Sequence, residues 1–276
     1  MNDSPLGSFL LPAGFQRPPV AALLHEGSLL AEAGRCAVRS VEERRIRRSR
    51  SFADRSVTRA AEPIVLVPGF LAGDASLAAL SAGLRRRGFR TYRSQILANV
   101  GCTLEAAGHV ESRVEAIVAK RGSRVQIVGH SLGGMIARGL AVRRPDLVAG
   151  IVTMGSPMLA PGAHHLALSC GVEALVRLSR AGLPGMMSEE CVAGTVARQS
   201  FDESREPLAA DVGFTAIYSR RDGIVDWRAC IDPIAVPVEV TTSHVGMAVD
   251  PRVLDEVTAA LRRHVEVAQQ VGLRIA

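Results

Sequence analysis

The segment VQIVGHSLGG (125–134) carries the strongest chemical signal in the sequence. It places Ser131 at the centre of a G-x-S-x-G pattern, between a predicted strand and a predicted helix. A serine hydroxyl becomes a useful nucleophile when it is exposed beside a base, and a sharp strand-to-helix turn lifts it out of the sheet. Gly129 and Gly133 permit that turn. We therefore predict a nucleophilic Ser131, against the alternative of a glycine-rich turn with an incidental serine.

A nucleophilic serine needs a general base, and His244 is the candidate among the seven histidines. It follows a predicted strand in a short Ser-His-Val-Gly loop, which can carry an imidazole over the serine. His130 adjoins Ser131 along the chain, but we expect it to point the other way across the turn and to support packing. His164 and His165 have no acidic partner at ligand spacing, so we interpret them as cap residues and not as metal ligands.

The third group is an acid that orients the imidazole, and it should follow the strand that precedes the histidine strand. Asp222 and Asp226 both qualify. The alternative for Asp226 is a turn or capping carboxylate ahead of Trp227. Asp232, which precedes a proline, is predicted to be a turn residue.

Short β-branched runs alternate with longer helical stretches from residue 64 onward, which predicts an α/β fold with a mostly parallel six-stranded sheet flanked by helices. Several runs are almost wholly apolar, as strands buried on both faces should be. A helix ending at Gly122 is predicted from the spacing of Val110, Val114 and Ile117, and another closes the chain. The predicted strands are 64–67, 91–96, 125–128, 151–154, 214–218 and 236–241.

Three further segments, VPGF, RRDGIVDW and TSHVGM, follow the first, fifth and sixth predicted strands. With the G-x-S-x-G pattern and the order Ser, Asp, His, they make residues 62–265 resemble the α/β-hydrolase superfamily, in its bacterial lipase and esterase branch. The resemblance implies a Ser-His-Asp triad and an acyl-enzyme. It favours Asp222 over Asp226, because the acid of those enzymes usually begins an Asp-x-x-Val pattern, here residues 222–225.

Acyl transfer also requires donors that stabilise the developing oxyanion. One should be the backbone N–H of Leu132, and the other should be that of Phe70, in the loop after the first strand. Many lipases have His-Gly where this chain has Pro68-Gly69, so this chain departs from the pattern and lacks that histidine side chain. A backbone donor remains available. The alternative is an ordinary strand-terminating Pro-Gly turn.

The chain divides into a helical and basic N-terminal extension (1–60) and a hydrolase domain (61–276) with a cap insertion at about 158–213. The inserted stretch is too long for an ordinary connection. We expect a mobile cap whose apolar side chains contact an acyl chain, against the alternative that these side chains only complete the core. These are Leu166, Leu168, Val172, Leu175, Val176 and Leu178. Cys191 in the cap and Cys230 after the acid loop would be joined if the cap folds back over the site.

Composition excludes several classes of protein. The net charge of +6 suggests nucleic acid, but residues 1–60 hold ten Arg against six acids, so the excess is mostly local and we predict no nucleic-acid partner. Within EERRIRRSR (42–50), the basic run offers peripheral contact with acidic membrane headgroups, although such runs are more often solvated helix faces. No apolar stretch is long enough to span a membrane and no secretory signal is apparent, which predicts cytoplasmic residence, with membrane association open.

The five cysteines lack metal-ligand spacing, and no metal or organic cofactor is implied. The sequence thus predicts a carboxylic-ester hydrolase acting on a small-molecule or lipid ester. An acyltransferase or thioesterase would use the same three residues with a different acceptor. A noncatalytic binding module of hydrolase-like fold is the alternative from another class.

Overall fold

The computed structural model describes residues 9–49 and 62–275. A six-stranded sheet forms its centre, with the strand order β2-β1-β3-β4-β5-β6, and every pair of neighbouring strands is parallel. The predicted α/β class is confirmed. The strands are β1 (Pro63–Val67), β2 (Arg90–Arg93), β3 (Val125–His130), β4 (Val148–Met154), β5 (Gly213–Tyr218) and β6 (Val236–Glu239).

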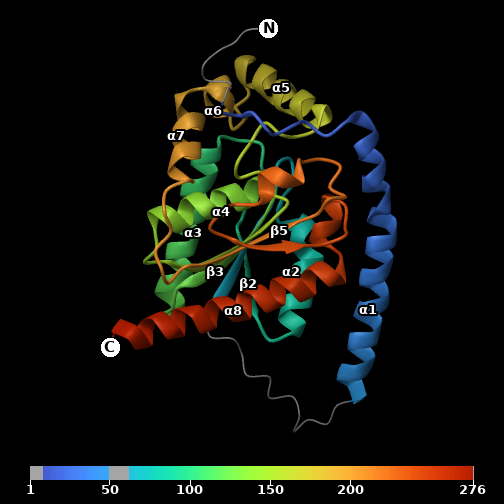
Figure 1. Cartoon of the computed structure of the whole chain (residues 1–276), viewed down its shortest axis with the longest axis vertical. Helices are drawn as coiled ribbons and strands as arrows, with labels where there is room; N and C mark the ends of the chain where they lie inside the picture. Colours follow the sequence, from blue (N-terminus) through green and yellow to red (C-terminus); the bar gives the residue numbers. More distant parts are fainter. Residues whose placement is uncertain (1–8, 50–61, 276) are drawn as a thin grey trace.

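Helices cover both faces of the sheet. On one face lie α3 (Thr103–Arg121) and α4 (Leu132–Arg143), and on the other lie α2 (Ala78–Arg86) and α8 (Pro251–Ile275) (Figure 1). Val65 and Val67 of β1 belong to the first core, whereas Ile64 and Leu66 belong to the second. Because successive side chains of a strand point to opposite faces, a strand buried on both faces must be apolar throughout.

The predicted helix before Gly122 is confirmed as α3. Val110, Val114 and Ile117 are buried along one side of it. Gly122 takes the left-handed conformation, with φ of 67°, and its N–H donates to the carbonyl of Val118. A glycine ends the helix here because it adopts positive φ without a steric penalty.

Two predicted strands are too long. The strand predicted at 91–96 ends at Arg93, because Ser94 N and Gln95 N donate to the carboxylate of Asp74 at 3.1 and 2.9 Å instead of to a neighbouring strand. Gln95 has φ of 70°, which is incompatible with a strand. The strand predicted at 236–241 ends at Glu239.

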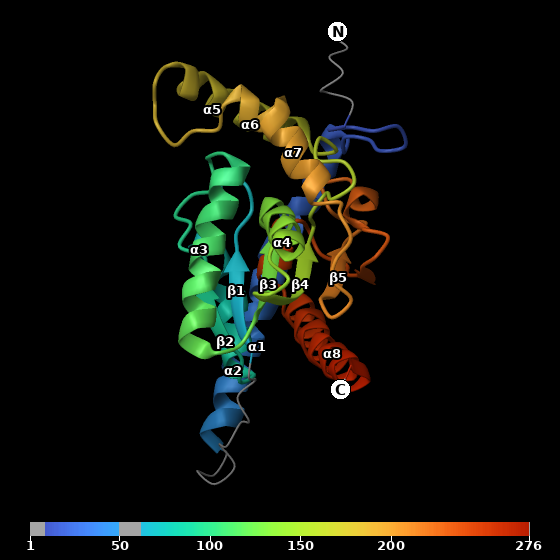
Figure 2. The same ribbon diagram turned by 90° about the vertical axis from the view of Figure 1, so that its left-hand side faces the viewer.

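The segment between β4 and β5 contains three helices. They are α5 (Leu166–Arg180), α6 (Glu189–Ala193) and α7 (Thr195–Glu203). Figure 2 shows them above the end of the sheet toward which the arrow of β1 points, and α7 packs against α3 and α4. The carboxyl ends of all six parallel strands meet at this end of the sheet.

The N-terminal segment runs outside the sheet and its covering helices. It contains the 3₁₀ helix η1 (Val20–Ser28) and the long helix α1 (Leu29–Ser49), which lies along one side of the molecule (Figure 1). Ion pairs join Arg35 to Asp250 and Arg39 to Asp255, each at 2.6 Å. Residues 1–8 and 50–60 of the predicted extension lie outside the described residues. No helix in the described ranges is long and apolar enough to cross a membrane.

Candidate active site

Ser131 occupies the turn between β3 and α4. Its backbone has φ of 52° and ψ of −123°, a sparsely populated conformation for a residue with a side chain. Its N–H donates to the carbonyl of Met154 at 2.8 Å. A Cβ atom at Gly129 would overlap the backbone of Gly133, and one at Gly133 would overlap the carbonyl of Val67. Both glycines of the G-x-S-x-G pattern are therefore required by close backbone contact.

His244 and Asp222 form a buried pair on neighbouring loops. Asp222 follows β5, and His244 precedes the 3₁₀ helix η5 (Val245–Ala248). Nδ1 of His244 lies 2.7 Å from Oδ2 of Asp222, so its N–H donates to the carboxylate. Oδ1 of Asp222 accepts from the N–H groups of Ile224 and Val225 at 2.9 and 2.8 Å. These bonds fix the carboxylate and leave Nε2 as the imidazole nitrogen available to accept a proton.

The charge around His244 favours its protonated form. Burial by itself lowers the pKa of the imidazole. The negative charge of Asp222, the hydrogen bond to it and the charge of Glu26 outweigh burial, so the pKa of His244 is raised above its ordinary value. A base with a raised pKa is a stronger proton acceptor, which suits removal of a proton from a hydroxyl.

The loops of Ser131 and His244 meet at the end of β4. Ser131 is bonded to the carbonyl of Met154, and a Cβ at the next residue, Gly155, would lie 2.9 Å from Nδ1 of His244. Among the described residues, Oγ of Ser131 and the imidazole of His244 are not within hydrogen-bonding geometry of each other. Such bonds are often long before a substrate binds.

His130 packs against the candidate base. Its Nε2–H donates to the carbonyl of His244 at 3.0 Å, and the two ring centroids are 4.8 Å apart. Burial, followed by repulsion from His244, lowers the pKa of His130 to about 3, so the ring is neutral. We expected His130 to support packing, and the structure adds a direct contact with His244 that the sequence did not reveal.

Asp226 takes a different position from Asp222. It begins the 3₁₀ helix η4 (Trp227–Cys230), where its carboxylate accepts from the N–H and side chain of Arg228 and from Gln16 N at 3.0 Å. Burial raises its pKa, but these donors outweigh burial and lower it. Asp232 accepts from Ile234 N in a turn. Of the aspartates considered from the sequence, Asp222 is the one bonded to His244.

The two amides expected to bind an oxyanion lie beside Ser131. Phe70 and Leu132 both contribute to the same cavity as Ser131. In the described ranges, neither backbone N–H donates a hydrogen bond, as is usual for Leu132 at the first position of a helix. Buried Asn99 holds the Phe70 loop. Its side-chain Nδ2 donates to Pro68 O at 3.0 Å, and its backbone carbonyl accepts from Leu71 N at 3.0 Å. No sequence motif marked Asn99.

A cavity of about 430 Å³ opens at Ser131. The predicted cap supplies Leu168, Val172 and Phe201 to its wall, and the N-terminal segment supplies Phe9 and Leu10. The rings of Phe9 and Phe201 are 5.4 Å apart. The wall is mostly apolar, as expected of a pocket that binds a hydrocarbon chain.

Several sequence predictions in the cap need correction. Of the six side chains predicted to contact an acyl chain, only Leu168 and Val172 line this cavity. Leu175 is buried away from it, Leu166 and Leu178 are exposed, and Val176 is not part of its wall. All five cysteines are free, so the predicted Cys191–Cys230 link is wrong. His164 lines the cavity, and His165 caps α5 through a bond from Ala167 N at 3.0 Å. The described residues contain no group of side chains that could hold a metal ion.

Comparisons with known proteins identify the family of the chain. The alpha/beta hydrolase family matches residues 64–273, so the chain belongs to that family. A triacylglycerol lipase of Vibrio cholerae is 30% identical over 151 residues, which cover 52% of this chain and 44% of the lipase. The chain therefore spans less than half of that relative's length.

Two solved structures share the fold at low sequence identity. A Bacillus licheniformis lipase in mature form has a TM-score of 0.57 and 14% identity, over 72% of this chain and 91% of the lipase. A monoacylglycerol lipase of Paleococcus ferrophilus has a TM-score of 0.51 and 16% identity, over 77% of this chain and 96% of that protein. At these identities the likeness concerns the fold alone.

Proposed function

We propose that this chain hydrolyses carboxylic esters, with Ser131 as nucleophile, His244 as general base and acid, and Asp222 as the group that orients the imidazole. The observation that carries the proposal is the strained turn of Ser131, which lines a mostly apolar cavity together with two residues whose backbone amides donate no hydrogen bond. The bond between His244 and Asp222 supports it, as does the similarity to a protein named as a triacylglycerol lipase.

In the first half of the reaction, Oγ of Ser131 attacks the ester carbonyl carbon while its proton passes to Nε2 of His244. The carbonyl oxygen becomes an oxyanion, which the amides of Phe70 and Leu132 stabilise. The tetrahedral intermediate then expels the alcohol, which takes the proton from His244. The product is an acyl-enzyme on Ser131.

In the second half, water attacks the acyl-enzyme. His244 accepts a proton from this water, and a second tetrahedral intermediate forms in the same place. It collapses to release the carboxylic acid, and the proton on His244 returns to Oγ of Ser131. Asp222 stabilises the imidazolium that forms in each half.

The cavity indicates the substrate class. Its apolar wall removes the acyl chain from water, which contributes about 0.8 kcal/mol for each buried CH₂ group. We propose that the segment 158–213 is a cap domain that selects medium or long acyl chains, and that the substrate is a small-molecule or lipid ester.

A fluorophosphonate probe tests the activated serine, because its phosphorus is attacked by a nucleophilic Oγ with loss of fluoride. Peptide mapping after labelling should place the adduct on Ser131 of the wild-type protein and find none in Ser131→Ala. Absence of labelling on the folded wild type would favour a noncatalytic binding module. Nitrophenyl esters of increasing chain length, assayed below and above their solubility, then report hydrolysis directly.

The nitrophenyl ester assay also distinguishes a hydrolase from a transferase. With an added alcohol or thiol, a hydrolase should release mainly the free carboxylic acid in water. A product that is mainly the new ester or thioester would show that the acyl-enzyme reacts with another acceptor, and the assignment as a hydrolase would fail.

A further inference from the structure

Two glutamates of the N-terminal segment contact the backbone of the loops that carry His244 and Asp222. Glu26 lies in η1, and its Oε1 accepts from His244 N at 2.9 Å and from Gly223 N at 3.1 Å. Its Oε2 accepts from Val245 N at 3.1 Å. One carboxylate thus joins the residue after Asp222 to the residue that supplies the base.

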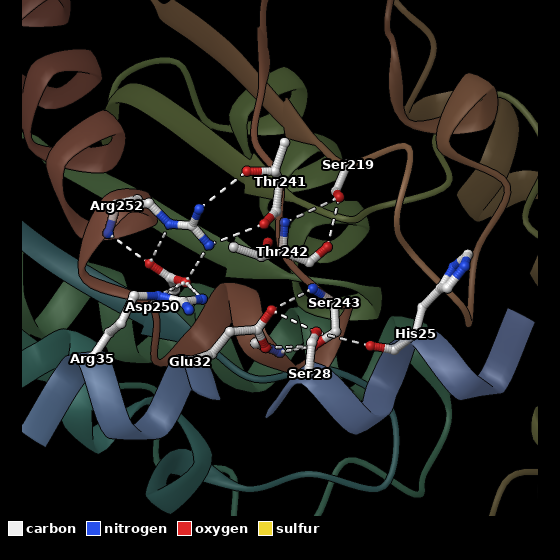
Figure 3. Close-up of polar contacts among 11 residues, drawn as sticks. His25, Ser28, Glu32, Arg35, Ser219, Thr241, Thr242, Ser243, Asp250 and Arg252 are labelled. Atoms are coloured by element: carbon white, nitrogen blue, oxygen red, sulfur yellow. Dashed lines mark hydrogen bonds and ion pairs between the residues drawn. The ribbon is translucent and has the colours of Figure 1, made fainter. Parts of the chain in front are cut away.

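Glu32, in the first turn of α1, contacts the residue before the base. Its Oε1 accepts from Ser243 N at 2.8 Å, and its Oε2 accepts from Ser243 Oγ at 2.6 Å (Figure 3). Ser28 Oγ donates a further bond to Oε1 at 2.9 Å. Ser243 Oγ in turn accepts from Gly246 N at 3.0 Å. The loop is therefore bonded to the N-terminal segment at three consecutive residues, 243–245.

The burial of Glu32 makes these bonds energetically important. Only 1% of its surface is exposed, and no Arg or Lys of the described chain forms an ion pair with its carboxylate. A buried carboxylate is costly unless its oxygens are hydrogen-bonded. The amide and hydroxyl of Ser243 supply that compensation, so the position of Glu32 and the position of the loop depend on each other.

Two glycines allow the close approach of the N-terminal segment. A Cβ at Gly246 would overlap Oε2 of Glu32, and one at Gly223 would overlap the carbonyl of Ala22. Neither glycine has the positive φ that would by itself favour glycine. Space for the N-terminal segment is therefore the reason that the structure gives for glycine at both positions.

We propose that Glu26 and Glu32 are positioning residues, which hold the His244 loop so that the imidazole faces Ser131. This inference rests on the proposed function, since it assigns His244 the role of base. The family match begins at residue 64, so both glutamates lie outside the region shared with the family. The N-terminal segment thereby becomes part of the catalytic machinery of this chain.

Electrostatics give the two glutamates different signatures. The groups that face His244 are Asp222, Glu26 and the neutral ring of His130. The charge of Glu26 adds to that of Asp222 in raising the pKa of His244 against the effect of burial. Removing that charge lowers the pKa, whereas a substitution that keeps the charge does not.

The first test measures kcat and KM for ester hydrolysis by full-length Glu26→Gln and Glu32→Gln. Misplacement of a catalytic group by about 1 Å costs up to about 100-fold, so we expect kcat to fall roughly 10- to 100-fold with KM little changed. Glu42→Gln is the matched control, because Glu42 lies exposed on α1, the helix that contains Glu32. In Glu26→Gln the acid limb of the kcat/KM profile should also move to lower pH, whereas in Glu26→Asp it should stay in place.

A second measurement does not depend on catalysis. Amide hydrogen exchange of residues 243–246 should accelerate in Glu32→Gln and in Glu26→Gln, and remain unchanged in Glu42→Gln. Should Glu32→Gln fail to fold, the test relies on Glu26→Gln and Glu26→Asp, because Glu26 is only half-buried. Native exchange rates and wild-type kcat in folded variants would overturn the inference. If the wild type hydrolyses no ester but amide exchange is faster in both variants, the proposed function would be overturned, and the support of the loop by the two glutamates would stand.

Discussion

The loops that carry Ser131 and His244 reach the same end of the sheet with different support. The turn of Ser131 is held locally, by a bond to Met154 and by backbone contacts that require Gly129 and Gly133. The loop of His244 is held by carboxylates more than 200 residues earlier in the chain, Glu26 and Glu32. The proposed nucleophile is therefore positioned by the sheet and its own turn, and the proposed base by a segment that precedes the family match.

This difference predicts different consequences of mutation. Changes near the serine turn disturb backbone packing within the sheet. Changes at Glu26 and Glu32 should leave the sheet intact and move the loop of His244.

The largest of these effects is expected for Asp222→Asn. An asparagine in this place favours the wrong imidazole tautomer, and kcat should fall on the order of 10⁴-fold with the fold unchanged. Asp226→Asn is the matched control, because Asp226 bonds to Arg228 and Gln16 and not to His244. A greater loss of kcat in Asp226→Asn would overturn the choice of acid.

The next largest effect is expected from substitutions in the wall of the cavity. Leu168→Ser or Val172→Ser should lower kcat/KM for long-chain esters by about tenfold and leave short-chain esters nearly unaffected, because fewer apolar contacts remain for the distal CH₂ groups. Leu178→Ser, at an exposed position of the same helix, should change neither. Equal losses for all chain lengths would mean that Leu168 and Val172 do not contact the acyl chain.

The pH profile tests the protonation of the base. His244 accepts a proton only when neutral, so kcat/KM should fall as the pH drops through its pKa. Because the pKa of His244 is raised, the acid limb should lie above about 6.5, the ordinary value for histidine. A limb below that value would contradict the environment described for His244.

The smallest effect is expected at the outer contact of α1. Arg39 forms two hydrogen bonds with Asp255, at 2.6 and 2.9 Å, on a partly exposed surface. Arg39→Gln should lower the free energy of unfolding in urea by less than about 1 kcal/mol and leave kcat unchanged. A marked loss of kcat would mean that anchoring of the whole helix, and not the two glutamates, positions the loop.

The sequence predicted the parts of the fold that depend on local pattern. Short β-branched runs located the six strands, and Gly122 located the end of α3. The sequence could not locate the end of β2, because the acceptor that replaces its ladder bonds is Asp74, 20 residues earlier. Side-chain contacts of this kind depend on the folded chain.

In the candidate site too, some residues could be predicted from local pattern and others only from contacts in the folded chain. Ser131, His244 and Asp222 follow strands in a recognisable order, so pattern alone brought them forward as candidates. Glu26, Glu32 and Asn99 have no motif and act through backbone groups that are remote in sequence. Their roles depend on three-dimensional contacts, which is also why the pocket residues Leu168 and Val172 could not be distinguished from Leu175 and Leu178.

The proposed role of Ser131 is tested most directly by hydrolysis of one nitrophenyl ester by the wild type and by Ser131→Ala, at matched thermal stability. Loss of the nucleophile should lower kcat on the order of 10⁶-fold, with residual turnover arising only from binding and the oxyanion amides. Near-normal hydrolysis by folded Ser131→Ala would contradict the assignment of Ser131 as the nucleophile.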